Sequence, residues 1–522
     1  MPIFRVPATN PQESAESHAL LMNLATIIDA HPGEAVALIS RRRTTTYGDL
    51  RAQAASLRGG LAGLGLEPGD RVAILAGNNW YFVASYLGVL GAGLVAVPLN
   101  PLSPSPEIER QLAAVGARGA IVAPTGKASF AGVDRGRVPS LEHIVYTDGD
   151  HGNGRVLLDD LLAARPAAVV ERADDDLAVL LFTAGTAGAP KAAMLTHGNL
   201  LANLEQLQAS PPRRQGPDDT AFGVIPLFHI FGLNVVLGLS LAAGSRVLLI
   251  ERFDPSSALD AIQTHGVTLI AGAPTMWAGW SALPGLPADA FASVRLAVSG
   301  AARLPIDVAQ SMQHRFGLTV AEGYGLTEAA PVVTSAGGLD PIKPGSIGSP
   351  LPGVEVRLVD PLGEDVLVGD EGEVWVRGPN VFHGYWDDPD ATEAALTPDG
   401  WLRTGDIGVV DDDGFLFLVD RAKDIIIVSG FNVYPGEVEE VLAEHPAVEA
   451  AAVVGVEHPH SGEAVKAFVV VRDGKSVEED EVIAFCAGRL ARYKCPDKVM
   501  FVDELPHGLA GKLIRRELRS DP

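Results

Sequence analysis

Short, almost continuous apolar runs alternate with helical patterns along the first part of the chain. Apolar runs at 72–75, 93–98 and 119–122 predict buried strands, and the spacing between them predicts helices at 80–92 and about 106–115. Strands that alternate with helices in this way are typical of a parallel sheet covered on both faces. The pattern predicts an α/β fold built from parallel sheets.

Further strands are expected at 177–182, 220–225, 245–250, 269–271 and 296–298. Most of them lead into loops rich in small residues. The carboxyl ends of parallel strands share one edge of a sheet, and ligands bind in the crevice beyond that edge. We therefore expect these loops to line a common binding crevice.

The pattern changes after Gly345 to short strands with alternating apolar and polar positions, at 354–360, 372–378 and 414–420. From Asp420 a new α/β composition begins, and about 100 residues remain, which is enough for a separate domain. We predict a large N-terminal domain of parallel α/β sheets at 1–419, including a small antiparallel β subdomain at about 345–419. A hinge at 420–423 then leads to a small, mobile α+β C-terminal domain at 424–522.

Composition narrows the range of partners. A net charge of −25 and a pI near 4.9 argue against nucleic acid as a partner. The first residues lack the features of a signal peptide, and the longest apolar stretch, 230–244, is too short for a transmembrane anchor. Two cysteines are too few for a disulfide framework. We expect a cytoplasmic protein, and the sequence leaves a homodimer open.

The segment 181–194 reads LFTAGTAGAPKAAM and follows a predicted buried strand. Its glycines allow the backbone to approach a ligand closely, while hydroxyls, amides and a lysine supply donors for an anion. Pro190 lies between the last glycine pair and Lys191, so the segment is not a Walker loop. It is either a phosphate-binding loop or an ordinary surface turn.

Seven motifs identify a resemblance that extends from Tyr47 to Leu518. In order they are FTAGTAGAPKAA, PLFHIFG, SGAA, EGYGLTE, GWLRTGDIG, DRAKDIIIVSGFNVYPGEVE and AGKLIRREL. The chain resembles the adenylate-forming (AMP-binding) superfamily, in its branch of acyl-CoA synthetases and fatty-acid–CoA ligases. The resemblance implies an acid–thiol ligase with ATP, Mg²⁺ and coenzyme A. A carboxylate would form an acyl-adenylate with release of pyrophosphate, and a thiol would then displace AMP.

The resemblance also implies roles for individual residues. Lys512 would be catalytic, bridging the carboxylate and the α-phosphate, and Lys423 would be the hinge. ATP or AMP would be bound by Thr183, Gly185, Thr186, Gly188, Lys191, Ala302, Gly323, Tyr324, Thr327, Asp406 and Arg421. Glu328 would hold Mg²⁺, with Thr183 as a second ligand. CoA would contact Arg252, Gly430, Phe431 and Asn432, and the acyl pocket would include His229, Phe231, Gly272, Gly300 and Ala301.

The walls of this pocket are mostly apolar, so a medium- or long-chain fatty acid is the expected substrate. An aryl acid remains an alternative, as does a fatty acyl-AMP ligase that loads a carrier protein. A third alternative is a catalytically weakened paralogue, because Ala184, Ala187 and Ala192 replace two hydroxyl residues and a glycine that the family usually carries in its phosphate loop.

Overall fold

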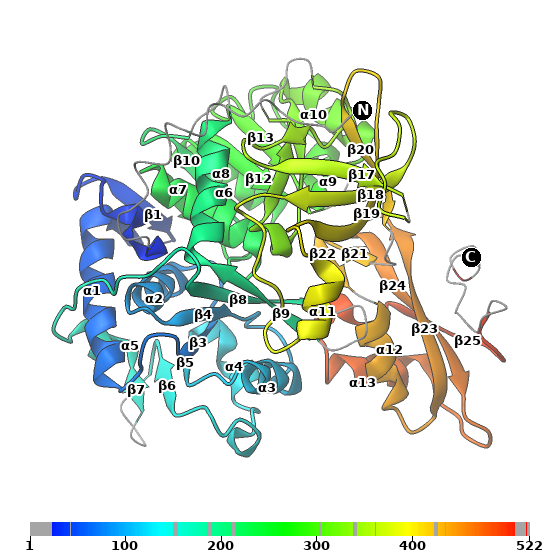
Figure 1. The fold of residues 1–522 in the computed structure, drawn as a ribbon, viewed down its shortest axis with the longest axis horizontal. Helices are drawn as coiled ribbons and strands as arrows, with labels where there is room; N and C mark the ends of the chain where they lie inside the picture. Colours follow the sequence, from blue (N-terminus) through cyan, green and yellow to red (C-terminus); the bar gives the residue numbers. More distant parts are fainter. Residues whose placement is uncertain are drawn as a thin grey trace.

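The computed structural model describes residues 23–41, 43–149, 155–184, 190–210, 215–301, 304–337, 342–360, 362–421, 426–433, 435–506 and 518. A large N-terminal domain contacts a smaller C-terminal domain, drawn in orange and red in Figure 1. None of the helices in the described part of the chain combines the length and apolar character needed to span a bilayer.

One sheet of the N-terminal domain has the strand order β7-β6-β5-β3-β4-β8-β9. Its strands run parallel except for the antiparallel pair β8–β9. Their bounds are β3 (Arg71–Leu75), β4 (Val95–Pro98), β5 (Gly119–Val122), β6 (His143–Tyr146), β7 (Val156–Leu157), β8 (Leu177–Ala184) and β9 (Pro190–Thr196). The associated helices are α1 (Tyr47–Gly63), α2 (Trp80–Gly91), α3 (Ser105–Ala114), α4 (Lys127–Phe130) and α5 (Leu158–Leu162). Thr46 and Asp49 form a capping box that fixes where α1 begins.

A second sheet has the order β16-β15-β14-β13-β12-β10-β11-β1-β2. Its strands are β1 (Val36–Ser40), β2 (Arg43–Thr46), β10 (Thr220–Gly223), β11 (Arg246–Leu249), β12 (Leu269–Gly272), β13 (Leu296–Ser299), β14 (Val320–Gly325), β15 (Val332–Ser335) and β16 (Ser349–Pro350). The run from β1 through β14 is parallel, and β2, β15 and β16 add antiparallel edges. Its helices are α6 (His197–Ala209), α7 (Leu239–Ala242), α8 (Pro255–His265), α9 (Pro274–Ala282) and α10 (Ile306–Phe316). The expected strands thus occur within one to two residues of their expected ends.

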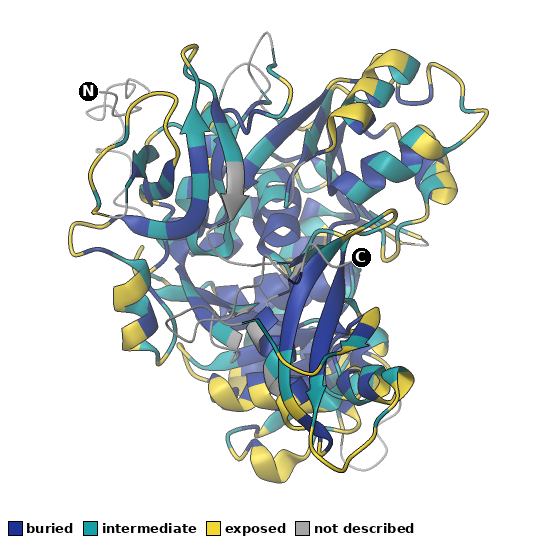
Figure 2. Ribbon diagram, turned by 90° about the vertical axis from the view of Figure 1, so that its right-hand side faces the viewer, coloured by how far each residue is buried: buried dark blue, intermediate teal, exposed yellow. Residues whose placement is uncertain are grey.

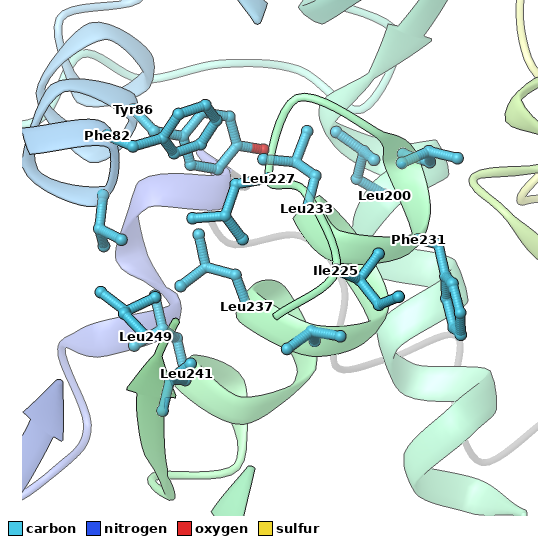
Figure 3. Packing of buried hydrophobic residues seen from close by; sticks show 14 of the residues in the cluster. Phe82, Tyr86, Leu200, Ile225, Leu227, Phe231, Leu233, Leu237, Leu241 and Leu249 are labelled. Atoms are coloured by element: carbon cyan, nitrogen blue, oxygen red, sulfur yellow. The ribbon is translucent and has the colours of Figure 1, made fainter. Parts of the chain in front are cut away.

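A π-helix at Phe231–Gly238 packs at the centre of the main hydrophobic core. Figure 3 shows its residues Leu233 and Leu237 among side chains that come from α2, α6 and β11. Figure 2 shows the strands of the sheets mostly buried, with exposed residues on outer helix faces and loops. The apolar stretch 230–244 is therefore a core element that joins the two sheets.

The β subdomain is an antiparallel sheet with the order β17-β18-β19-β20. Its strands are β17 (Glu355–Val359), β18 (Gly372–Arg377), β19 (Leu402–Val410) and β20 (Leu416–Arg421), and α11 (Pro389–Ala395) lies between β18 and β19 in sequence. The C-terminal domain has the order β22-β21-β24-β23, with β25 parallel to β24. Its elements are β21 (Ile426–Val428), β22 (Phe431–Val433), α12 (Pro435–Ala443), β23 (Val448–His458), β24 (Gly462–Val471), α13 (Glu479–Ala487) and β25 (Lys498–Phe501). This architecture confirms the predicted fold class.

Candidate active site

The predicted phosphate loop connects the two strands of the β8–β9 hairpin. Thr183 and Lys191 face each other in the hairpin register, next to the loop. Gly185, Thr186 and Gly188 lie outside the described residues. The base of the hairpin bonds to a neighbouring segment, because Met194 N donates to Gly384 O at 2.9 Å and Trp386 N donates to Ala192 O at 2.8 Å.

Lys191 points toward this neighbouring segment, 384–388. Its Nζ lies 3.7 Å from Asp388 Oδ2 and 5.3 Å from the centroid of the Tyr385 ring. A half-exposed carboxylate and an aromatic face thus hold the Lys191 ammonium beside the loop.

Tyr385 contacts Lys191 with its ring and Glu328 with its hydroxyl. The Tyr385 hydroxyl donates to Glu328 Oε1 at 2.7 Å, and Phe382 N donates to the Glu328 carbonyl at 2.9 Å. Three buried asparagine side chains donate hydrogen bonds to backbone carbonyls of the segment that follows Glu328. Asn380 Nδ2 donates to Ala329 O at 2.7 Å. Asn234 Nδ2 donates to Ala330 O at 2.8 Å, and Asn203 Nδ2 donates to Val332 O at 2.8 Å. These bonds fix the backbone around Glu328, so its carboxylate is positioned in advance of any ligand.

The carboxylate chemistry fits Mg²⁺. His, Cys, Asp and Glu side chains in the described ranges form no cluster of three or more that could hold a metal ion. Magnesium in nucleotide sites is commonly held by one or two carboxylates together with phosphate oxygens and water. Glu328, beside the hairpin that carries Thr183, suits that arrangement.

Tyr324 and Asp406 join the second sheet to the β subdomain. The Tyr324 hydroxyl donates to Asp406 Oδ2 at 2.7 Å, and both residues are buried. Asp406 is paired with Arg421 in the β19–β20 register. The structure thus brings three of the predicted nucleotide residues to one place, while Gly323 and Thr327 flank Tyr324 along the chain.

A cavity of about 410 Å³ begins beside Tyr324 and Gly300 and continues along the second sheet. Its wall near the carboxyl ends of the strands includes Ser299 and Ala301, and its far wall includes Leu269, Leu296 and the polar Gln208, Ser210 and Gln215. Of the predicted acyl-pocket residues, His229, Phe231, Gly300 and Ala301 line this cavity. Gly272 instead packs against Met276 and Trp277.

Two residues shape the cavity near the predicted reaction centre. A Cβ added to Gly300 would lie 3.1 Å from Phe231 Cζ, so the absent side chain leaves room for the aromatic ring. Burial lowers the pKa of His229 to about 4, so the imidazole is neutral near pH 7. A cavity wall with a neutral imidazole suits the uncharged acyl chain of a substrate.

The C-terminal domain approaches Ala301, in the wall of this cavity, through Gly430. Ser429 and Gly430 adopt φ values of 52° and 84°, and a Cβ on Gly430 would lie 3.0 Å from Ala273 Cβ and 3.9 Å from Ala301 Cβ. A larger residue would therefore clash with the N-terminal domain. Phe431 stacks on Tyr493 with ring centroids 4.4 Å apart. Arg252 lies exposed just beyond β11.

Several predicted residues lie beyond what the structure describes. Lys512, Lys423 and Ala302 are outside the described residues, and the side chains of Arg421 and Asn432 are not described. Their roles remain predictions from the sequence. Conversely, no sequence pattern pointed to Tyr385 or to the amides of Asn203, Asn234 and Asn380, because their partners are far away along the chain.

Comparison with known proteins places this site in a family. The family model described as "AMP-binding enzyme" matches residues 25–386, and the model described as "AMP-binding enzyme C-terminal domain" matches residues 437–512. The chain belongs to the AMP-binding enzyme family. It is therefore an enzyme of the AMP-forming acid–CoA ligase type.

Relatives in this family act on different acids. The chain is 36% identical to a long-chain-fatty-acid–CoA ligase of Bacillus subtilis, covering 98% of this chain and 96% of the relative. It is 39% identical to a feruloyl-CoA synthase of Amycolatopsis, covering 91% of this chain and 93% of the relative.

Solved structures of the family agree in fold. The amide bond synthetase McbA of Marinactinospora thermotolerans matches with a TM-score of 0.86 and 34% identity, covering 96% of this chain and 99% of that chain. The o-succinylbenzoate CoA synthetase MenE of Bacillus subtilis, bound with a product analogue, matches with a TM-score of 0.83 and 30% identity at the same coverage. ATP-bound MatB of Rhodopseudomonas palustris matches with a TM-score of 0.72 and 32% identity, covering 96% and 98%.

Proposed function

We propose that the protein activates a medium- or long-chain fatty acid with ATP and transfers the acyl group to coenzyme A. In the first step a carboxylate oxygen attacks the α-phosphorus, the bond to the β-phosphate breaks, and pyrophosphate leaves. In the second step the CoA sulfur attacks the acyl carbon and AMP leaves, while the thiol proton is lost. Both steps depend on positioning and on stabilising charge.

The cavity carries this proposal. It follows the face of the second sheet from Ser299 at the carboxyl end of β13 to Leu296 at its start, which is about 10 Å at the usual rise of about 3.3 Å per residue. Beyond Leu296 the cavity continues to Gln208 and Gln215. A mostly apolar cavity of that length fits an extended acyl chain, with its carboxylate beside Gly300 and Tyr324.

The charged residues around the site match the first step. Lys191, beside the phosphate loop, would neutralise phosphate oxygens, and Glu328 would hold Mg²⁺, which screens the charge of the triphosphate when bound. Asp406, held by Tyr324, would accept hydrogen bonds from the ribose. Lys512 would bridge the carboxylate and the α-phosphate.

The position of Gly430 supports a thiol acceptor that enters between the domains. Gly430 lies against Ala273 and Ala301 at the start of the cavity, so an acceptor arriving beside this turn would meet the acyl carbon.

An aryl acid is the second candidate, and the far end of the cavity favours it. Gln215 Nε2 donates to Ser240 Oγ and Ser245 Oγ at 2.8 and 2.6 Å, and Gln208 and Ser210 lie nearby in the cavity wall. A hydroxyl on an aromatic ring would find hydrogen-bond partners there, whereas a methyl terminus would not.

A panel of carboxylic acids distinguishes these functions. Pyrophosphate release is measured with ATP and Mg²⁺ for fatty acids of increasing chain length and for hydroxylated aryl acids, with and without CoA. The proposal expects the highest kcat/KM with fatty acids and a CoA thioester as product. Pyrophosphate release without thioester formation would point to a carrier-protein acceptor, and no release with any acid would point to a weakened paralogue.

A further inference from the structure

A buried ionic cluster joins the two domains, and its three residues lie outside the lining of the cavity. It consists of Glu107 on α3 of the N-terminal domain, and Glu437 on α12 and Lys494 of the C-terminal domain. Lys494 Nζ lies 3.0 Å from Glu107 Oε1 and 2.8 Å from Glu437 Oε1. The side chains of Lys494, Glu107 and Glu437 are only 8%, 3% and 4% exposed. Figure 1 shows α3 and α12 on the adjoining sides of the two domains.

Glu107 is directed at the C-terminal domain with both of its oxygens. Its second oxygen, Oε2, accepts a hydrogen bond from Ala491 N at 3.1 Å, across 384 residues of sequence. Pro104 precedes α3 and Glu107 lies in its first turn, where the helix dipole favours a negative charge. Ile108 and Leu112 of the same helix are fully buried in the N-terminal core, so α3 presents Glu107 from a rigid support.

Lys494 is shared by a carboxylate of each domain only while the domains are in contact. Burial by itself lowers the pKa of Lys494, but Tyr493 and the two carboxylates raise it well above its ordinary value. Burial raises the pKa of Glu437, and the Lys494 ammonium offsets only part of that rise. If the C-terminal domain turned away, Glu107 would lose Lys494 and Ala491 N but keep Gln111 Nε2 of its own helix, at 3.5 Å. Lys494 and Glu437 would stay together in the C-terminal domain. Removing one partner of a buried ion pair leaves an uncompensated buried charge, so the contact with Glu107 favours this arrangement of the domains.

The same contact surface places Gly430 against Ala301. Phe431, next to Gly430, stacks on Tyr493, and Lys494 follows Tyr493 directly. The ionic cluster and the turn at the cavity are thus connected through one stacked aromatic pair. An orientation that satisfies Glu107 also brings Gly430 to the reaction centre.

We propose that Glu107 is a positioning residue for the second half-reaction, which holds the C-terminal domain through Lys494 in the orientation that admits the thiol acceptor. This inference rests on the proposed two-step function. Glu107 touches neither nucleotide nor acyl residues, so adenylation, which requires Lys512, proceeds without it.

The test separates the two half-reactions in the full-length protein. Glu107→Gln keeps the shape of the side chain and removes its charge. Adenylation is followed as pyrophosphate release from ATP and acid without CoA, and thioester formation is followed after mixing preformed acyl-adenylate with CoA. We expect Glu107→Gln to slow thioester formation about tenfold or more, as loss of a charged hydrogen bond would, and to leave adenylation within about twofold of wild type. Equal losses in both half-reactions, or no loss in the second, would overturn the proposal.

Glu109→Gln is the matched control. Glu109 is a buried carboxylate on the same helix, but its partners are Asp134 N at 3.0 Å and Arg137 within the N-terminal domain. This variant should leave both half-reactions unchanged. A fall in thioester formation equal to that of Glu107→Gln would assign the effect to α3 in general.

A double-mutant cycle tests whether Glu107 acts through Lys494. Glu107→Gln and Lys494→Gln should not add, because each removes the same contact. Additive effects would contradict the proposal. If Lys494→Gln does not fold, comparison of Glu107→Gln with Glu109→Gln still decides whether Glu107 supports the second half-reaction.

Amide hydrogen exchange gives a readout that does not depend on activity. The proposal expects faster exchange at residues 488–495 in Glu107→Gln but not in Glu109→Gln, and unchanged exchange would contradict it. If the wild-type protein releases no pyrophosphate with any acid, the proposed function fails, whereas the exchange result still decides whether Glu107 holds the domain.

Discussion

The hydroxyl of Tyr385 donates a hydrogen bond to Glu328 Oε1 at 2.7 Å, although the two residues are 57 positions apart. Tyr385 also places its ring beside Lys191. One side chain therefore contacts both the proposed metal ligand and the lysine next to the phosphate loop.

Tyr385→Phe should weaken the use of Mg²⁺. The ring would remain beside Lys191, but Glu328 would lose the donor that orients it, and residues that support metal ligands typically contribute about 10- to 100-fold. We expect the apparent KM for Mg²⁺ in pyrophosphate release to rise by at least about tenfold. Tyr146→Phe, at a half-buried tyrosine on β6, serves as the control. An unchanged Mg²⁺ requirement would mean that Tyr385 does not orient this carboxylate.

Gly300→Ala should change the preference for acids. The new methyl group would lie 3.1 Å from Phe231 Cζ and would push the ring into the cavity. We expect kcat/KM to fall about 10- to 100-fold for long acids and less for short ones. A change of one methylene group in the fit of a hydrophobic pocket alters kcat/KM by about that factor. Gly63→Ala, with no atom within 4 Å of the added Cβ, is the control. A uniform fall across the panel would contradict this account of the cavity.

Lys512→Ala should affect the opposite half-reaction from Glu107→Gln. Removal of a positive charge placed at the developing charge of adenylation should slow pyrophosphate release about 100-fold or more. Thioester formation from preformed acyl-adenylate should remain close to wild type. Lys498→Ala removes an exposed lysine on β25 and should change neither step. A loss of thioester formation in Lys512→Ala would mean that the lysine serves both steps.

His197 should make the stability of the protein depend on pH. Its Nδ1 accepts a hydrogen bond from Leu24 N at 2.9 Å, and burial, followed by Arg172, lowers its pKa from 6.5 to about 4. Because the unfolded chain takes up the proton first, this contribution is complete above about pH 6.5 and is lost as the pH falls toward 4. The full difference is on the order of 3 kcal/mol.

His197→Gln should reduce the fall in melting temperature between pH 7 and pH 5. His265→Gln, at an exposed histidine ending α8, should leave that fall as in wild type. If the two variants behave alike, protonation of His197 is not a source of acid sensitivity.

The sequence predicted the strands well because a buried strand needs an uninterrupted apolar run. The runs at 119–122 and 269–271 correspond to β5 and β12. Polar contacts over long distances leave no such pattern. Glu107 and Lys494 are separated by 387 residues, and neither position differs in the sequence from an ordinary surface charge. The Tyr385–Glu328 contact was missed for the same reason.

The backbone bonds between the β8–β9 hairpin and residues 384–386 make the base of the phosphate loop continuous with the segment that carries Tyr385. Within this segment Tyr385 contacts both Lys191, beside the loop, and Glu328, so ATP and Mg²⁺ would bind to groups that share one support. Thermodynamic linkage makes the coupling between them reciprocal, so ATP and Mg²⁺ should each raise the affinity of the protein for the other by the same factor.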